Sequence, residues 1–211
     1  MNNEGRLQNI KLWVNSHVYI CIVTYLVAHT SLFFLISNFV EPKYYMHTAF
    51  DDMVPLCEYL IVPYVSWFLA FAGSLVFMAR NDRCNFWRMF LAQVLGSTIC
   101  CVVYVFFQNA ITMPQQTVNH NIFSLILELV WASDNTTNAC PSLHVLSSTV
   151  IAVVTWYCNY FKNKPILKLA IMLWMIIICI STMFVKQHSI IDVICGAILG
   201  IILALVAKKL I

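Results

Sequence analysis

Two short stretches of the sequence combine residue types that can bind and transfer a phosphoryl group. The first is CPSLHV at residues 140–145, where Pro141, Ser142 and His144 stand at the start of an apolar run. Proline fits the first turn of a helix, so Ser142 and His144 would lie where free backbone N–H groups and the positive end of the helix dipole attract anions. We therefore predict a phosphate-binding helix N-terminus at this position.

The second stretch is KQHSIID at residues 186–192, in which His188 and Asp192 stand four apart and can share one helical face. An aspartate in that position can accept a hydrogen bond from one imidazole nitrogen. It would fix the tautomer and leave the lone pair of the other nitrogen free to attack. His144 and His188 are therefore the candidate catalytic histidines, whereas His17, His29, His47 and His120 are interpreted as ordinary core or interface residues.

The composition indicates which elements hold these residues. Of the 211 residues, 61% are hydrophobic and 10% are charged, and the mean hydropathy of +0.81 lies far outside the range of soluble domains. A bilayer crossing takes about 20 apolar residues, and such stretches occur at 18–40, 54–79, 86–108, 141–160, 166–186 and 190–207. We predict an all-α integral membrane bundle of six transmembrane helices, forming a single domain over residues 1–211 because no linker or repeat divides the chain.

The basic residues predict the orientation of this bundle, because lysine and arginine collect on the cytoplasmic side. With six crossings, one side receives Arg6, Lys11, Arg80, Arg83, Arg88, Lys162, Lys164, Lys168, Lys208 and Lys209, and the other side receives only Lys43 and Lys186. Both termini should therefore be cytoplasmic, and both histidine motifs extracytoplasmic. The net charge of +3 reflects this bias, so we expect no nucleic-acid partner.

The longest extramembrane segment, 109–140, contains the apolar stretch 122–132, which is too short to cross a bilayer. Its length predicts a short interfacial or re-entrant helix, with Ser124 and Glu128 on its polar face and Trp131 at the headgroup level. Such a helix could form a lid over a lipid-accessible cleft or be a surface helix without a role.

Gly196 and Gly200 form a GxxxG pattern in the last predicted span. Small residues at this spacing let two helices approach closely. We expect them to pack against another helix of the same chain rather than to form a dimer.

The two polar stretches also carry a family resemblance. PSLH at 141–144 resembles the PSGH motif of the type-2 phosphatidic acid phosphatase superfamily, and the spacing of Ser181, His188 and Asp192 resembles that family's SRxxxxxHxxxD motif. The resemblance implies a six-span membrane enzyme that uses no metal or cofactor. It further implies that His188 attacks phosphorus to form a phosphohistidine, that Asp192 orients His188, and that His144 protonates the leaving oxygen.

The resemblance also implies that Ser142 and neighbouring backbone amides, including that of Leu143, bind the phosphate oxygens. The sequence departs from the family at the phosphate-binding cations. With Pro114 aligned to the first family motif, KxxxxxxRP, its two basic positions fall on Phe106 and Met113, and the third-motif arginine becomes Thr182. A bound phosphate dianion in an apolar cleft still needs compensation, so we predict that Lys186 substitutes for the lost cations.

These observations predict a membrane lipid phosphatase that hydrolyses a lipid phosphate or diphosphate at the extracytoplasmic face, in the plasma membrane. A lipid phosphotransferase of the sphingomyelin or inositol-phosphoceramide synthase type is the first alternative, because a phosphodiester needs fewer cations. A catalytically inactive lipid-binding relative is the second. The expected partners are the lipid substrate and the bilayer, and the sequence leaves the oligomeric state open.

Overall fold

The computed structural model describes residues 16–39, 41–112, 114, 119, 121–133 and 137–211 as an assembly of helices. The basic residues Arg6 and Lys11 and the histidine His120 lie outside the described residues. In chain order the elements are α2 (Val18–Phe39), β1 (Tyr44–Tyr45), α3 (Ala49–Met53), η1 (Glu58–Leu60), α4 (Ile61–Asn81), α5 (Arg83–Phe106), β2 (Asn109–Ala110), α6 (Ile122–Ser133), α7 (Leu143–Tyr157), η2 (Asn159–Phe161), α8 (Pro165–Phe184) and α9 (Ile190–Leu210).

Five helical segments of the described chain are long and apolar enough to cross a membrane. They are α2, η1 with α4, α5, α8 and α9, and they correspond to five of the six predicted spans. The sixth prediction falls on α7, which has 15 residues and so a length of about 22 Å, less than the bilayer core of about 30 Å. The protein is therefore an all-α membrane protein with five candidate spans, and a sixth crossing by α7 stays a prediction.

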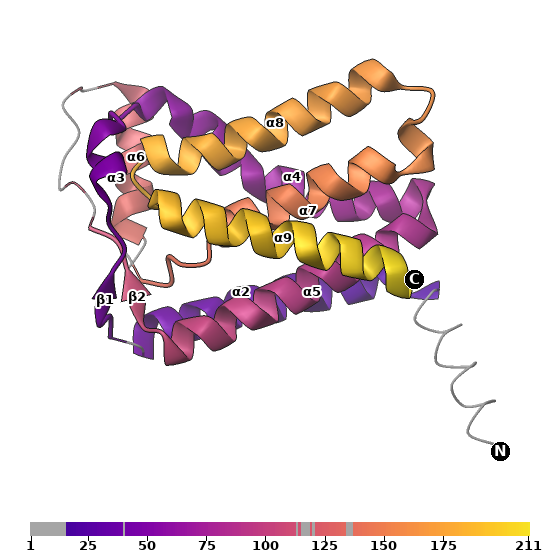
Figure 1. The fold of residues 1–211 in the computed structure, drawn as a ribbon, viewed down its shortest axis with the longest axis horizontal. Coiled ribbons are helices and arrows are strands. Elements are labelled where there is room, and N and C mark those ends of the chain that lie inside the picture. Colours follow the sequence, from indigo (N-terminus) through magenta and orange to yellow (C-terminus); the bar gives the residue numbers. More distant parts are fainter. Residues whose placement is uncertain (1–15, 40, 113, 115–118, 120, 134–136) are drawn as a thin grey trace.

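Helix α7 lies at the centre of the bundle, packed against α4, α5, α8 and α9 (Figure 1). Its inward face is built from β-branched and aliphatic side chains such as Val150, Ile151 and Val154, all at most 2% exposed. Because four helices pack against α7, it suits a residue set that must be held rigidly.

The glycines of α9 set the distance between α9 and α7. A Cβ atom on Gly196 would lie 2.6 Å from the carbonyl oxygen of Ser142, and one on Gly200 would lie 2.8 Å from that of Leu146. Both contacts are within the chain, which confirms that the GxxxG pattern is used for intramolecular packing. The close approach brings the first turns of α7 and α9 together.

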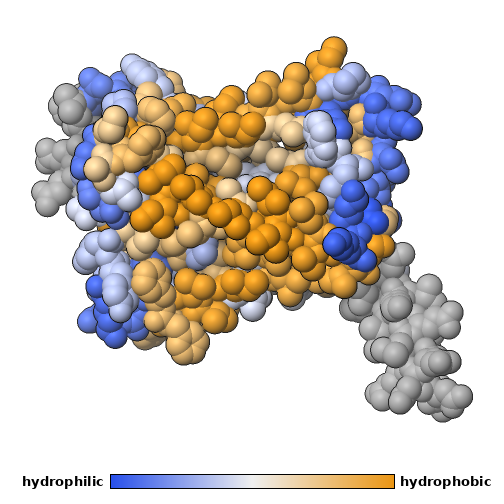
Figure 2. All heavy atoms as spheres, viewed as in Figure 1, coloured by the Kyte–Doolittle hydropathy of each residue, from blue (hydrophilic) through white to orange (hydrophobic). Residues whose placement is uncertain are grey.

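The polar residues collect at the two ends of the bundle, with an apolar band between them (Figure 2). The α4–α5 turn, the α7–α8 turn and the C-terminal end of α9 lie at one end of the bundle, together with the start of α2 (Figure 1). These turns carry the basic residues of the described chain other than Lys43 and Lys186, as the sequence predicted. The first turns of α7 and α9, which carry the histidine motifs, lie at the opposite end.

Helix α6 confirms the predicted short helix over 122–132. Ser124, however, lies on the buried face of this helix and not on an exposed polar face. Ser124, Leu127 and Trp131 are buried on the side that faces η1 and α4. The Trp131 indole donates a hydrogen bond to the carbonyl oxygen of Val185 at 3.0 Å. Trp131 therefore packs against the protein, because the spacing of 124, 127 and 131 follows the helical period and points these side chains inward. Its placement at the headgroup level stays a prediction.

Candidate active site

The turn between α8 and α9 fixes His188 through its backbone. Helix α8 ends in a Schellman motif: Gln187 N–H donates to the carbonyl oxygen of Thr182 at 2.9 Å, and Lys186 N–H donates to that of Met183 at 3.1 Å. His188 N–H also donates to the Thr182 carbonyl, at 3.1 Å. Thr182 stands where the family motif has an arginine. Its backbone carbonyl oxygen thus fixes the backbone of His188.

Helix α9 begins directly after His188 with a capping box. Ser189 is the N-cap, and its N–H donates to Asp192 Oδ2 at 2.8 Å. The same oxygen lies 3.6 Å from His188 Nδ1, and the Asp192 side chain is fully buried. The two groups are therefore close but not hydrogen-bonded, and contacts of this kind are often long before a substrate binds. The predicted spacing of four residues therefore does place the carboxylate beside the imidazole.

The first turn of α7 is joined to α9 at this point. Ser142 is the N-cap of α7, with its hydroxyl oxygen accepting from Val145 N–H at 3.3 Å. Its own N–H donates to the carbonyl oxygen of Asp192 at 3.1 Å. Among the described residues, the N–H groups of Leu143 and His144 have no hydrogen-bond acceptor, so they are available to an anion at the positive end of the helix dipole.

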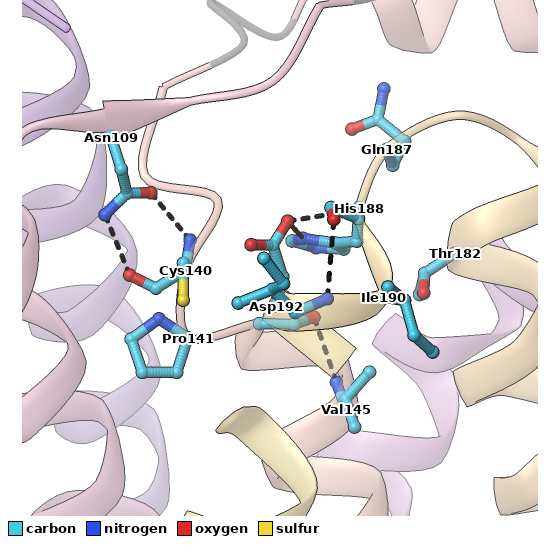
Figure 3. A network of polar contacts seen from close by, with 12 residues as sticks. Asn109, Cys140, Pro141, Val145, Thr182, Gln187, His188, Ile190 and Asp192 are labelled. Atoms are coloured by element: carbon cyan, nitrogen blue, oxygen red, sulfur yellow. Dashed lines mark hydrogen bonds and ion pairs between the residues drawn. The ribbon is translucent and has the colours of Figure 1, made fainter. Parts of the chain in front are cut away.

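Asn109 holds the extended segment that leads into α7. Its side-chain oxygen accepts from Cys140 N–H at 2.7 Å, and its side-chain N–H donates to the Cys140 carbonyl at 2.9 Å (Figure 3). The Tyr104 hydroxyl donates to the carbonyl of Pro141. The backbone polar groups of Cys140 and the carbonyl of Pro141 are therefore satisfied inside the protein, as burial requires.

The two candidate histidines meet at the junction of these elements. Their ring centroids are 5.8 Å apart and their planes are tilted by 59°. His144 is also flanked by aromatic rings, with Tyr64 stacked at 4.6 Å and Trp67 tilted at 4.2 Å between centroids. Trp67 is itself fixed, because its indole N–H donates to Ser147 Oγ at 2.6 Å. Two imidazoles from separate elements therefore lie within reach of one small ligand.

Three buried polar atoms of this cluster have no hydrogen-bond partner within the described part of the chain. They are His144 Nε2, His188 Nδ1 and Asp192 Oδ1. Unpartnered buried polar groups are unfavourable and mark either strain or a place where a ligand binds. His188 Nδ1 faces the Asp192 carboxylate at 3.6 Å, so the unpartnered His144 Nε2 is the atom that favours a ligand site.

A cavity of about 460 Å³ opens from the two histidines between α2 and α4. Its walls are mainly apolar and aromatic, and include Phe33 and Phe34 of α2 and Phe68 and Phe71 of α4. The polar residues along it include Ser37, Asn138 and Gln187. Such a combination, with polar groups at one place and a hydrocarbon surface along the rest, is typical of a site for an amphiphilic molecule.

Lys186 does not reach this cavity. Its ammonium group donates to the carbonyl oxygens of Asp51, at 3.0 Å, and Val54, and Lys186 is not among the residues that line the cavity. Among the described residues that do line it, none is a lysine or an arginine. The side chain turns towards α3 and the residues around it, 47–54, which we call the α3 segment. The prediction that Lys186 replaces the family cations is therefore not supported by its position.

The predicted residues His144, His188, Asp192, Ser142 and Leu143 are thus brought together, and their catalytic roles stay predictions. Sequence reasoning missed Trp67, Ser147, the backbone role of Thr182 and the structural role of Asn109. Nothing in a single sequence shows that these positions face the motifs. In the described chain there is no group of three or more His, Cys, Asp or Glu residues arranged to hold a metal ion.

Comparison with known proteins supports the resemblance of the motifs. Residues 107–211 match the sequence model of the PAP2 superfamily. The chain belongs to the PAP2 superfamily. That membership supports a lipid phosphatase in general terms. The crystal structure of Aquifex aeolicus LpxE is similar to this PAP2 protein, with a TM-score of 0.48 and 21% sequence identity over 85% of this chain and 94% of the other. No curated protein matches the sequence.

Proposed function

We propose that this PAP2 protein is a membrane lipid phosphatase that hydrolyses a lipid phosphate or diphosphate at the extracytoplasmic face through a phosphohistidine intermediate. The observation that carries the proposal is the pairing of His144 and His188, with ring centroids 5.8 Å apart, at the end of an apolar cavity. The carboxylate of Asp192 lies 3.6 Å from His188 Nδ1 and supports His188 as the nucleophile.

In the proposed mechanism the carboxylate of Asp192 keeps the proton on His188 Nδ1, which leaves the Nε2 lone pair free. Nε2 attacks phosphorus, and the bond from phosphorus to the lipid oxygen breaks while protonated His144 gives its proton to that oxygen. Neutral His144 then takes a proton from a water molecule, whose oxygen attacks the phosphohistidine. The P–N bond breaks and inorganic phosphate leaves.

The backbone at the start of α7 supports binding of the phosphate without a cationic side chain. The N–H groups of Leu143 and His144 are available donors, and the N-terminus of a helix carries a partial positive charge. Donors aimed at the phosphate oxygens would stabilise the negative charge of the transition state. Ser142 supports this role by capping the helix, so that its first amides are held in place.

The position of the site within the bundle supports an extracytoplasmic location. The histidines lie at the end opposite the turns that carry most of the basic residues, and the latter end is expected to face the cytoplasm. We infer that the enzyme lies in the plasma membrane with its site facing outward. A substrate would then enter from the outer leaflet with its hydrocarbon chain in the cavity between α2 and α4.

A lipid phosphotransferase is the second candidate, and a specific observation favours it. The described residues that line the cavity include no lysine or arginine. A phosphomonoester dianion is harder to bind without cations than a phosphodiester monoanion. In a transferase the same phosphohistidine would be attacked by the hydroxyl group of a second lipid instead of by water.

One experiment separates these candidates from an inactive lipid-binding protein. The purified protein in detergent micelles is incubated with phosphatidate, a polyprenyl diphosphate or a phosphodiester lipid, with and without a lipid alcohol. Release of inorganic phosphate supports the phosphatase, a new phosphodiester supports the transferase, and absence of any product from the whole panel contradicts both.

The matched variants are His188→Ala and His47→Ala. His188→Ala should lower turnover at least a thousandfold and abolish the acid-labile phosphohistidine, because the nucleophile is removed. His47 lies on the α3 segment, where it pairs with Asp52 at 3.1 Å, so His47→Ala should keep turnover within twofold. Undiminished activity in His188→Ala would rule out the mechanism.

A further inference from the structure

The segment around α3 contacts the turn that carries His188, and the mechanism above does not use it. Asp51 of α3 accepts hydrogen bonds from the Ser189 hydroxyl at 2.7 Å and from Ile190 N–H at 2.8 Å. It also accepts from the N–H and hydroxyl groups of Thr48, both at 2.8 Å. One carboxylate therefore joins the loop between α2 and α4 to the first turn of α9.

Asp51 and Asp192 each accept a hydrogen bond from a different backbone N–H group at the start of α9. Asp192 binds the N–H group of the N-cap residue Ser189, and Asp51 binds that of Ile190, the first residue of the helix. Both groups would otherwise lack a partner at a helix N-terminus, where negative charge is also favourable. His188 directly precedes these two capped positions, so its backbone position depends on both carboxylates.

Lys186 provides a second connection between the α8–α9 turn and the α3 segment. Its ammonium group donates to the backbone carbonyls of Asp51 and Val54. The turn and the α3 segment are thus fastened twice, once by the carboxylate of Asp51 and once by the ammonium group of Lys186. Lys186 stands two residues before His188 in the sequence, and Asp51 binds the two residues that follow His188, Ser189 and Ile190.

The backbone of Lys186 shows that a lysine is unusual at this position. Its φ is +58°, in the left-handed region that the residue after a Schellman helix end adopts and that glycine favours. For a residue with a Cβ atom this conformation is strained. The two carbonyl contacts give a reason for a lysine to occupy a position where glycine would be less strained.

We propose that Asp51, with Lys186, is a positioning residue that clamps the α8–α9 turn and holds His188 in line for attack on phosphorus. This inference rests on the proposed function of His188. It assigns to Lys186 a role in positioning the nucleophile, in place of direct phosphate binding.

The protonation of Asp51 agrees with this role. Partial burial raises the pKa of the Asp51 carboxyl, but hydrogen bonds from Ser189, Ile190 and Thr48 outweigh that effect and hold the pKa below its usual value. The group is therefore ionised at neutral pH and accepts all four hydrogen bonds.

The test compares Asp51→Asn with Asp52→Asn in the full-length protein, with phosphatidate or whichever lipid in the panel is turned over. The amide introduced by Asp51→Asn would keep one acceptor oxygen but place an N–H₂ group where the second carboxylate oxygen accepts. We expect kcat to fall at least tenfold while KM changes less than twofold, because the nucleophile is misplaced and the substrate site is intact. Asp52 is exposed and pairs with His47, so Asp52→Asn should keep both constants within twofold.

Lys186 variants separate the clamp from phosphate binding. With a clamp, Lys186→Met lowers kcat about tenfold and leaves KM nearly unchanged. With a phosphate contact, the same change raises KM strongly, because a charge-assisted hydrogen bond to the substrate is lost. A tenfold rise in KM at constant kcat would therefore overturn the proposal.

Hydrogen exchange gives a readout that does not depend on turnover. The Ile190 amide should exchange at least tenfold faster in Asp51→Ala, which removes both acceptor oxygens, than in the wild type, with no change in Asp52→Ala. Unchanged exchange at Ile190, or unchanged kcat despite faster exchange, would refute the clamp. If the wild type turns over no lipid but the exchange result holds, the proposed function fails while the contact of Asp51 with α9 stands.

Discussion

His144 lies among both polar and aromatic side chains, and its neighbours explain how its ring is held. The rings of Tyr64 and Trp67 lie against it at centroid distances of 4.6 and 4.2 Å. Trp67 donates to Ser147 Oγ, and Ser147 in turn donates to the carbonyl oxygen of Leu143 at 2.6 Å. This chain of contacts connects α4 to the first turn of α7 beside His144.

Replacing Trp67 by phenylalanine should therefore slow turnover while an aromatic ring still lies against His144. Trp67→Phe keeps an aromatic ring near His144 but removes the indole N–H that binds Ser147. We expect kcat to fall about five- to tenfold and the free energy of unfolding to fall by about 1 kcal/mol, the usual contribution of one buried hydrogen bond. Steady-state kinetics and thermal unfolding in detergent measure the two effects.

Trp174→Phe is the matched control for this substitution. The Trp174 indole also donates to a serine hydroxyl, Ser66 Oγ, at 3.1 Å, but it lines a different cavity, remote from the histidines. Its loss should leave kcat within twofold. Equal losses of activity in the two variants would mean that Trp67 acts only through general stability.

At the scale of single residues, the sequence was sufficient for groups whose partners are close in the chain. His188 and Asp192 are four apart, and Ser142 precedes its helix, so local geometry alone predicts their contacts. The contacts of Lys186 could not be predicted, because its partners, Asp51 and Val54, lie more than 130 positions away. Trp67 and Asn109 were missed as structural supports for the same reason.

At the scale of the elements, the site depends on the approach of α7 and α9. Gly196 lies where a side chain would meet the backbone of Ser142, the residue that caps α7. The hydrogen bond from Ser142 N–H to the Asp192 carbonyl, at 3.1 Å, needs the two helix starts to stay in contact. Helix spacing therefore controls the separation of the two histidines.

Gly196→Ala should push α9 away from α7. Its Cβ atom would lie 2.6 Å from the Ser142 carbonyl oxygen, and because that atom is backbone, the helices must shift. Overpacking of this kind destabilises by about 1–3 kcal/mol, and we expect turnover to fall at least tenfold. Gly73→Ala is the control, since a Cβ atom there meets nothing within 4 Å; a similar loss of turnover in both variants would contradict the argument.

Element positions were largely predictable from hydropathy, and the exceptions have physical causes. The apolar stretches over α2, α5, α8 and α9 are long and uninterrupted, so their length alone indicates a span. Helix α7 is shorter than its predicted span because Ser142 caps it at the start and the chain turns into η2 after Cys158. For α6 the apolar stretch located the helix, but which face is buried depends on η1 and α4, which no local pattern reveals.

At the scale of the whole molecule, the two ends of the bundle are chemically different. One end carries the clusters of basic side chains, and the other carries the histidine pair, the α3 segment and α6. Such an arrangement suits an enzyme that receives an amphiphile from one leaflet, because the headgroup can meet the histidines while the hydrocarbon chain remains among apolar helices. The cavity between α2 and α4 provides that path.

Filling this cavity should discriminate between long and short substrates. Ala72 of α4 lines the cavity, and Ala72→Phe would occupy space that we assign to the hydrocarbon chain. We expect KM for a long-chain lipid phosphate to rise about tenfold, which corresponds to losing the burial of about two methylene groups at ~0.8 kcal/mol each. The KM for a short-chain, water-soluble analogue and the kcat for both should change less than twofold, because the histidines are untouched. Ala70, two residues away, lines the separate cavity between α4, α7 and α8, so Ala70→Phe should leave both KM values unchanged. If Ala72→Phe raised KM for the short-chain analogue as much as for the long-chain lipid, the cavity would not hold the hydrocarbon chain.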